Sequence, residues 1–240
     1  MSLKAMILAA GSGTRLMPLT ALTPKPMLPI DGRPLLQHVV EYLVRSHVDH
    51  IVINLHHHPE VITNHFGDGH KWGVDIVYSY ESQLLGTAGA VKKVSAIFNE
   101  PFLVVYGDNL TNCKLDQLAK SHARNEASVT VALYRRNDVS ESGVAELEGT
   151  DRIVRFVEKP RSTDVTSTWV NAGILMLQPE VLEMIPEERV CDFGRDVLPN
   201  LLVMGKRIYG YRMTTGEHLS WIDTPEDYKR LCTTALGEND

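Results

Sequence analysis

The chain has 240 residues, of which 43% are hydrophobic and 22% charged, and these proportions are typical of a globular protein with a sizeable core. Its formal net charge of −6 argues against a general nucleic-acid binder, which usually carries a basic face. A few local cations can still form a site for phosphorylated ligands in an acidic protein.

The sequence predicts neither a disulfide framework nor a membrane-spanning segment. Its three cysteines, Cys113, Cys191 and Cys232, are widely spaced and show no metal-ligand pattern, which favours a reducing compartment. The apolar run at residues 6–10 is too short for the core of a signal peptide, and no stretch reaches the length of a membrane span. We therefore expect a cytoplasmic protein whose partners include neither nucleic acid nor a membrane.

Strands and helices alternate along the first half of the chain. Short apolar runs rich in β-branched residues predict strands at residues 3–9, 51–55, 74–78 and 102–106. Amphipathic spacing predicts helices at residues 35–46, 60–66, 87–98 and 115–125. This alternation is typical of a parallel sheet that is covered by helices on both faces.

The second half of the chain is less regular. Strand candidates outnumber helices there, and they lie at residues 128–134, 143–148, 153–158, 171–177 and 207–213. Because no repeat or linker divides the sequence, we expect one Rossmann-like α/β domain over residues 1–240 with a mixed, mostly parallel central sheet. In such sheets ligands bind beyond the carboxyl ends of the strands, so the turns after those ends are the places to search for a site.

The first of these turns has the features of a phosphate-binding loop. Gly11 and Gly13 let the backbone turn sharply and bring N–H groups to an anion. Arg15 adds a planar guanidinium that can grip phosphate oxygens at two points. Further along, Lys25 stands between two prolines, which restrict the backbone and hold the side chain in a defined direction.

Other interpretations of this turn compete at the level of the residues. A dinucleotide fingerprint needs a third glycine at position 16, which is leucine, and a Walker A loop needs a Gly-Lys-Ser/Thr sequence that is absent. An ordinary strand-to-helix turn would explain residues 11–13 taken alone. The combination with Arg15 and the Pro-Lys-Pro element favours phosphate binding.

Two later turns carry residues suited to other parts of such a site. Small residues at positions 86–89 let the flat base of a nucleotide lie close to the backbone, and Gln83 could form hydrogen bonds with the edge of that base. The alternative is a glycine-containing loop that opens a helix at Thr87. Asp108 follows the strand at residues 102–106, where a carboxylate either holds Mg²⁺ beside a phosphate or caps the next turn.

A third turn, Glu158-Lys159-Pro160, offers a second positioned cation. Glu158 can accept hydrogen bonds from sugar hydroxyls, and Lys159 can hold a sugar phosphate. Without other motifs, the same pair would be read as two solvated surface charges.

One long run places these features in a known family. The chain resembles the signature of the sugar-1-phosphate nucleotidyltransferases in LAAGSGTRLMPLTALTPKPMLPIDGRPLL, which extends from Leu8 to Leu36, and the later motifs follow in the family's order. The resemblance implies a GT-A-like nucleotidyltransferase domain. It also implies a nucleotide-binding half at about residues 1–125 and a sugar-phosphate half at about residues 126–240.

In this family the first turn binds the triphosphate. The resemblance therefore implies that Arg15 and Lys25 are catalytic and neutralise charge on the α-phosphate and the leaving pyrophosphate. It assigns nucleotide binding to the first turn and to a base-recognition loop, namely to Ala10, Gly11, Ser12, Gly13, Thr14, Gln83, Leu85 and Gly86.

The later motifs imply the metal and sugar-phosphate contacts. Asp108 and Asp223 would be the protein ligands of Mg²⁺. Sugar-phosphate binding falls to Glu158, Lys159, Asn171 and Gly173. The stretch after Asp223 departs from the common pattern, because a residue pair that ends in glycine is missing before Thr-Pro. Either Asp223 remains the ligand with a shortened turn, or the local path has moved.

Three adjacent histidines, His56, His57 and His58, follow the predicted strand at residues 51–55. Neighbouring residues of a strand point to opposite faces, so three in a row seldom chelate one ion. We expect them to lie at the surface or at the rim of a substrate site.

The implied reaction joins a nucleotide from an NTP to a sugar 1-phosphate and releases pyrophosphate. The LGTAGA, FVEKP and TPEDY stretches most resemble mannose-1-phosphate guanylyltransferases, so GTP and mannose 1-phosphate are the expected substrates. Glucose-1-phosphate thymidylyl- or uridylyltransferases and heptose-1-phosphate guanylyltransferases are the alternatives within the class. A catalytically silent NDP-sugar-binding regulatory protein is the alternative of another class, and the retained charged residues argue against it. Homo-oligomer formation and feedback control are left open.

Overall fold

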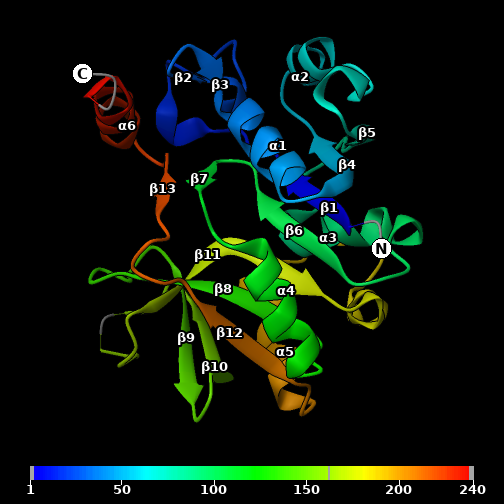
Figure 1. Ribbon diagram of the computed structural model, residues 1–240, viewed down its shortest axis with the longest axis vertical. Coiled ribbons are helices and arrows are strands. Elements are labelled where there is room, and N and C mark those ends of the chain that lie inside the picture. The colour runs from blue at the N-terminus through cyan, green and yellow to red at the C-terminus, as the bar shows by residue number, and fades with distance from the viewer. Residues whose placement is uncertain (1–2, 162, 238–240) are drawn as a thin grey trace. The chain divides into compact units, whose positions relative to one another are not determined.

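The computed structural model describes residues 3–161 and 163–237 of the chain. Its elements group into two units, each assembled from segments that are distant in the sequence (Figure 1). The first unit contains Met1–Leu84, Tyr106–Asn112 and Leu219–Asp240, and the second contains Leu85–Val105 and Cys113–His218. The turns singled out from the sequence are therefore divided between the two units.

Three parallel strands form the centre of the first unit. β4 (Val48–Leu55) lies between β1 (Leu3–Leu8) and β5 (Asp75–Tyr80) and pairs in parallel with both. Consecutive residues of β1 and β4 are fully buried, as expected for strands that are covered on both faces. Since parallel strands run in the same direction, the turns that follow all three lie along one edge.

Helices and short strand pairs complete the first unit. α1 (Leu35–Arg45) contacts β4 and buries an apolar stripe made of Leu35, Leu36, Val39, Val40 and Leu43. α2 (Pro59–Phe66) contacts β5, and α6 (Pro225–Gly237) is the last helix. Two antiparallel pairs join β2 (Pro29–Ile30) to β3 (Arg33–Pro34) and β7 (Asn109–Thr111) to β13 (Leu219–Trp221). Single 3₁₀ turns occur at Thr14–Leu16, Lys25–Met27 and His70–Trp72.

A mixed sheet forms the second unit. Its strands follow in the order β6 (Phe102–Tyr106, whose last residue belongs to the first unit), β11 (Trp169–Leu177), β8 (Val129–Arg135), β12 (Ile208–Arg212), β10 (Arg152–Glu158) and β9 (Gly143–Glu148). β8 and β12 pair in parallel, whereas the other neighbours are antiparallel. β9 also pairs with β11, which brings the ends of β9, β10 and β11 to one corner.

Helical segments pack on this sheet. α4 (Leu115–Arg124) contacts β8, β11 and β12, and α5 (Leu198–Val203) contacts β10 and β12. α3 (Gly86–Lys93) contacts a π-helical turn at Phe193–Val197, which leads directly into α5. Two 3₁₀ segments lie at Ser95–Ile97 and Pro179–Met184.

The expected α/β class with a mixed sheet is confirmed, and parallel pairing is concentrated in the first unit. The helix expected at residues 87–98 ends at Lys93, because Val94 leaves the helical region before the next 3₁₀ turn. The helices between β11 and β12 and the pair formed by β7 and β13 were not expected from the sequence. Within the described residues, no helix is long and apolar enough to cross a membrane.

Candidate functional site

The first turn is closed by a contact between Gly13 and Thr20. Gly13 has a left-handed conformation with φ of 62°, and a Cβ there would lie 3.0 Å from Thr20 Cγ2 and 3.1 Å from Lys25 Cβ. The buried Thr20 hydroxyl donates to the Gly13 carbonyl oxygen at 2.8 Å. Glycine is therefore required at position 13, where the turn comes against the backbone that carries Lys25.

Lys25 lies between two carboxylates in the first unit. Its Nζ donates to Asp108 Oδ2 at 2.6 Å and to Asp223 Oδ1 at 3.1 Å. The exposed Arg15 donates to the same Asp223 oxygen at 3.0 Å. These four residues form one cation–carboxylate group, although they come from three separate motifs of the sequence.

Electrostatics in this group favour the charged lysine. Burial would by itself lower the pKa of Lys25, but the carboxylates of Asp108 and Asp223 outweigh it and raise the pKa above its ordinary value of 10.5. The ammonium is therefore a permanent positive charge, and its side chain is only 11% exposed. Such a charge, with Arg15 beside it, is suited to a polyphosphate.

A short strand ladder brings the two carboxylates together. Asp108 immediately precedes β7, and Asp223 follows β13 by two residues. Because Asn109 pairs with Trp221 in the antiparallel ladder, both carboxylates lie at the same end of the pair.

The chain passes from Asp223 directly into a capped helix. Asp227 Oδ2 accepts hydrogen bonds from the Thr224 backbone N–H at 3.0 Å and from its hydroxyl at 2.9 Å, and the Asp227 N–H donates back to Thr224 Oγ1 at 3.1 Å. This reciprocal capping box, with Pro225 at the first helical position, begins α6 two residues after Asp223. Asp223 itself accepts a hydrogen bond from Lys25.

An apolar cluster holds the segments that carry these charges. Leu16, Leu28, Ile30, Leu35 and Ile222 are at most 4% exposed and pack together, with Leu110 and Tyr228 against them. Leu16 follows Arg15, and Ile222 precedes Asp223 in the chain. The charged side chains are therefore fixed by their nearest apolar neighbours.

The donor set of this group fits the divalent metal that the resemblance implies. Oxygens of Asp108 and Asp223 approach a single cationic centre, the Lys25 ammonium, from two sides. Mg²⁺ is commonly held by one or two carboxylates together with substrate phosphates and water. Among residues 3–161 and 163–237, no three His, Cys, Asp or Glu side chains gather as a metal site, so the remaining ligands would have to come from substrate and water.

The loop that is expected to recognise the base lies at the boundary of the two units along the sequence. Gln83 is exposed and belongs to the first unit, while Leu85 and Gly86 begin the second. Gly86 has φ of 75°, and a Cβ there would lie 2.5 Å from the Cys191 carbonyl oxygen. Glycine is therefore required at position 86 by the close approach of the segment around Cys191.

Glu158 ends β10 in a pocket made by two glycines, and we call Gly143, Glu158 and Gly194 the glutamate corner. A Cβ at Gly143 would lie 2.6 Å from Glu158 Oε2, and a Cβ at Gly194 would contact the same oxygen, so a side chain at either position would require Glu158 to move. Burial and the nearby charge of Asp192 raise the pKa of Glu158 above its ordinary value of 4.5. The carboxylate is a partly buried hydrogen-bond acceptor.

The other expected sugar-phosphate residues lie around the same corner of the sheet. Lys159 is exposed and donates to Glu141 at 3.1 Å. Asn171 lies in β11, where its Oδ1 accepts from the Gly173 N–H at 2.9 Å. Gly173 is buried with φ of 74°, at a register irregularity of β11. Because β9 pairs with both β10 and β11, Glu158 and Asn171 lie at neighbouring strand positions.

Sequence reasoning missed three polar residues that fix these segments. Asn54 is buried in β4, accepts from the Ala9 N–H at 2.7 Å and donates to Glu81 at 2.7 Å, so it holds the backbone just before the first turn. Thr87 donates to Asp192 at 2.8 Å. An aspartate before a helical run is an N-cap signal, which could have singled out Asp192. Asn54 gives no comparable signal, because its contacts are distant in the sequence.

The three histidines form hydrogen bonds with backbone carbonyl groups. His56 Nδ1 lies 2.8 Å from the Glu81 oxygen, and His57 Nε2 lies 3.2 Å from the Thr20 oxygen. His58 Nε2 is also 3.2 Å from a carbonyl oxygen, that of Ala21. His57 and His58 therefore connect the end of β4 to the loop between the first turn and Lys25, and His56 connects it to the residue that follows β5.

Comparison with known proteins identifies the family. Residues 4–229 match the family model described as Nucleotidyl transferase. UTP–glucose-1-phosphate uridylyltransferase of Synechocystis is 35% identical over 235 residues, which cover 92% of this chain and 60% of that protein. Mannose-1-phosphate guanylyltransferase of Mycobacterium tuberculosis is 36% identical over 228 residues, which cover 94% of this chain and 62% of that protein. The chain belongs to the nucleotidyl transferase family, and the resemblance to sugar-1-phosphate nucleotidyltransferases is confirmed.

A solved structure shares the fold of this chain. A UDP-glucose pyrophosphorylase complexed with UDP-glucose superposes with a TM-score of 0.86 at 23% identity, over 100% of both chains. By contrast, the chain spans less than two thirds of the length of the two curated relatives, 60% and 62%.

Proposed function

We propose that this chain transfers a nucleotidyl group from an NTP to a sugar 1-phosphate, giving an NDP-sugar and pyrophosphate. The observation that supports this most directly is the cation–carboxylate group, in which Lys25 and Arg15 meet Asp108 and Asp223 beside a glycine turn. Two cations next to two potential metal ligands suit the triphosphate of an NTP. The proposal includes a Rossmann-like, GT-A-like domain and a cytosolic location.

The reaction does not require a general base on the protein. A phosphomonoester is already ionised near neutral pH, because its second pKa is about 6. The sugar-phosphate oxygen can therefore attack the α-phosphorus directly. The main obstacles are the repulsion between two polyanions and the charge on the leaving pyrophosphate, so positioning and electrostatic stabilisation carry the catalysis.

The residues of the first unit handle the triphosphate in this proposal. Lys25 and Arg15 neutralise charge on the α-phosphate and on pyrophosphate, and the backbone N–H groups of residues 10–14 contact phosphate oxygens. Mg²⁺ bound by Asp108 and Asp223 would supply further neutralisation of the phosphates. Lys25 donates to both carboxylates, so a metal ion held by the aspartates would leave its ammonium available to phosphate oxygens.

The residues of the second unit hold the base and the sugar phosphate. Leu85 and Gly86 contact the base, with Gln83 from the first unit reading its edge. Glu158 accepts hydrogen bonds from sugar hydroxyls, and Lys159 contacts the sugar phosphate. Asn171 is a sugar contact for which Gly173 makes room.

GTP and mannose 1-phosphate are the substrates we propose. The support is the LGTAGA, FVEKP and TPEDY stretches, together with a 36% identical relative named mannose-1-phosphate guanylyltransferase. A relative of almost the same identity, 35%, is named for UTP and glucose 1-phosphate, so uridylyl or thymidylyl transfer to glucose 1-phosphate is the second candidate. Guanylyl transfer to a heptose 1-phosphate is a third.

A substrate panel separates these candidates. Pyrophosphate release is measured with each of ATP, GTP, CTP, UTP and dTTP against mannose, glucose and heptose 1-phosphates, with Mg²⁺ present. We expect the highest kcat/KM with GTP and mannose 1-phosphate. A higher value for UTP or dTTP with glucose 1-phosphate would replace our substrate assignment and leave the reaction class intact.

The same panel tests the alternative of a silent regulatory protein. Such a protein would release no pyrophosphate in any combination but would still bind an NDP-sugar in calorimetry. The complete set of charged residues, Arg15, Lys25, Asp108 and Lys159, favours the enzyme, because binding a finished NDP-sugar does not require a group that stabilises a leaving pyrophosphate.

A further inference from the structure

A segment that no predicted motif includes lies against the start of α3. The Cys191 N–H donates to the Leu85 carbonyl oxygen at 2.9 Å, and the Cys191 carbonyl oxygen accepts from the N–H groups of Ala88 at 2.9 Å and Gly89 at 3.1 Å. A Cβ at Gly89 would lie 2.6 Å from the Arg189 carbonyl oxygen. The backbone of the base-recognition loop and the backbone of this segment are therefore in direct contact.

Thr87 and Asp192 make this contact specific. The Thr87 hydroxyl donates to Asp192 Oδ2 at 2.8 Å and accepts from the Phe193 N–H at 2.9 Å. The other oxygen of Asp192 accepts from the N–H groups of Gly194 at 3.0 Å and Arg195 at 3.2 Å. Both oxygens of the carboxylate are engaged, so its orientation is fixed from two sides.

The same segment meets the glutamate corner. Gly194, whose N–H donates to Asp192, comes so close to Glu158 that a Cβ at Gly194 would contact Glu158 Oε2. A continuous path of contacts thus runs from Thr87 through Asp192 and Gly194 to Glu158. Its two ends are the loop assigned to the base and the carboxylate assigned to the sugar.

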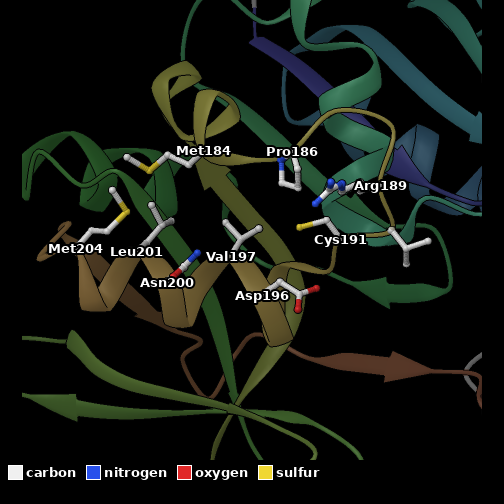
Figure 2. A pocket seen from close by; sticks show the side chains of 10 residues that line it. Met184, Pro186, Arg189, Cys191, Asp196, Val197, Asn200, Leu201 and Met204 are labelled. Atoms are coloured by element: carbon white, nitrogen blue, oxygen red, sulfur yellow. The ribbon is translucent and has the colours of Figure 1, made fainter.

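The opposite side of the segment faces a cavity of about 470 Å³ (Figure 2). Cys191, Asp196 and Val197 line it together with Met184 and Leu201. Core packing of the fully buried Phe193 and the hydrogen bonds to the start of α3 together hold the segment. The cavity leaves room beside Cys191 and Asp196 into which the segment can move when the hydrogen bonds of the Thr87 hydroxyl are lost.

We propose that Thr87 and Asp192 are positioning residues that set the base-recognition loop and Glu158 in one fixed arrangement, so that both substrate-binding sites depend on the two hydrogen bonds of the Thr87 hydroxyl. The inference rests on the proposed function, because it takes the roles of Leu85, Gly86 and Glu158 from it. Neither Thr87 nor Asp192 contacts a reacting atom in this account.

Thr87→Val tests the inference, because it removes the hydroxyl and keeps the shape. We expect the KM values for the NTP and for the sugar 1-phosphate each to rise roughly tenfold, the factor that corresponds to losing a hydrogen bond to a charged group. Thr87→Ser restores the hydroxyl and should return both KM values to within about twofold of the wild type. In the double variant Thr87→Val/Asp192→Asn, the losses should be smaller than the product of the two single losses, because both substitutions act on the bond between Thr87 and Asp192.

Thr214→Val is the matched control. It removes a hydroxyl–carboxylate hydrogen bond of the same 2.8 Å length, from Thr214 to Glu217, elsewhere in the second unit. A purely structural role for Thr87 predicts that Thr87→Val and Thr214→Val both lower the melting temperature and leave the KM values unchanged. If the wild-type enzyme is active, that result would overturn the positioning role of Thr87 and leave the proposed function intact. A wild type without pyrophosphate release in any substrate combination would instead overturn the proposed function, and this inference with it.

Discussion

Lys25 donates to both Asp108 and Asp223, so each carboxylate lies opposite a positive charge. If these carboxylates hold the catalytic metal, Asp108→Asn should leave the fold intact and lower Mg²⁺-dependent turnover by roughly 100-fold or more, as the loss of a major electrostatic contact does. The measurement is kcat for pyrophosphate release with increasing Mg²⁺. Asp116→Asn, an exposed change on α4 that also removes a carboxylate, is the control and should keep normal turnover. Near-normal turnover in Asp108→Asn would contradict the assignment of Asp108 as a metal ligand.

Glu158 is a carboxylate whose charged form the folded protein disfavours. Burial and Asp192 raise its pKa above the ordinary 4.5. A carboxyl group with a raised folded-state pKa contributes stability that is present below its unfolded pKa and is lost as pH rises through the folded pKa. Glu158→Gln should therefore raise the melting temperature at neutral pH, and this gain should shrink as pH falls toward 4.5.

The same Glu158→Gln variant should bind the sugar phosphate less tightly. An amide cannot accept hydrogen bonds from sugar hydroxyls with both of its polar atoms, so the KM for the sugar 1-phosphate should rise while the KM for the NTP changes little. A lower melting temperature at neutral pH would contradict the destabilising effect of the charged Glu158. An unchanged KM for the sugar 1-phosphate would contradict its role as a sugar contact.

Lys159 is exposed and pairs with Glu141, so its replacement should have little effect on folding. Lys159→Ala should weaken sugar-phosphate binding in calorimetric titration by roughly tenfold or more, because a charge-assisted contact is lost, while NTP affinity is kept. Glu141→Ala removes the competing carboxylate and should leave sugar-phosphate binding unchanged or slightly tighter. Equal losses for both substrates in Lys159→Ala would count against the assignment.

At the scale of elements, the charged residues depend on how short segments pack. Asp223 stands between Ile222, which is 0% exposed in the apolar cluster, and the capping box that begins α6. Neither element has a strong pattern of its own: β13 has three residues, and the capping box is recognised only once the helix is known. The position of Asp223 therefore depends on tertiary packing and not on a local sequence pattern.

Ile222→Ala should show this dependence. Truncation of a buried isoleucine costs about 2–5 kcal/mol of unfolding free energy, because it leaves a cavity. We expect a lower denaturant midpoint together with reduced kcat in the fraction that remains folded, since Asp223 is the next residue. As a control, Val203→Ala truncates a side chain that is 86% exposed on α5 and should change neither quantity appreciably. Normal kcat in folded Ile222→Ala would show that the cluster does not position Asp223.

At the scale of the whole molecule, the strands of the first half were predictable because each is a short apolar run followed by a glycine or polar turn. β6 has the expected bounds, Phe102–Tyr106, and β1 ends one residue earlier than expected. The helices between β11 and β12 were missed because they are a 3₁₀ segment, a π turn and a six-residue helix, none long enough to show helical periodicity.

The candidate site was predictable in its residues and not in its connections. Arg15, Lys25 and Asp108 stood out by residue type in their turns, and Asp223 was expected only from the family resemblance. Their contact follows from the pairing of β7 with β13, which the sequence does not signal. The tie between Thr87 and Asp192 spans 105 positions and involves common polar residues, so no local pattern marks it.

The proposed reaction transfers the nucleotidyl group of an NTP, with its α-phosphorus, to a sugar 1-phosphate and releases pyrophosphate. The most direct measurement uses GTP labelled at the α-phosphorus, with mannose 1-phosphate and Mg²⁺, and follows the label and the pyrophosphate together. We predict that the label appears in an NDP-sugar, with one pyrophosphate released for each labelled product and none without the sugar phosphate. Absence of label transfer with every NTP and sugar 1-phosphate, or release of single phosphate groups in place of pyrophosphate, would contradict the claim.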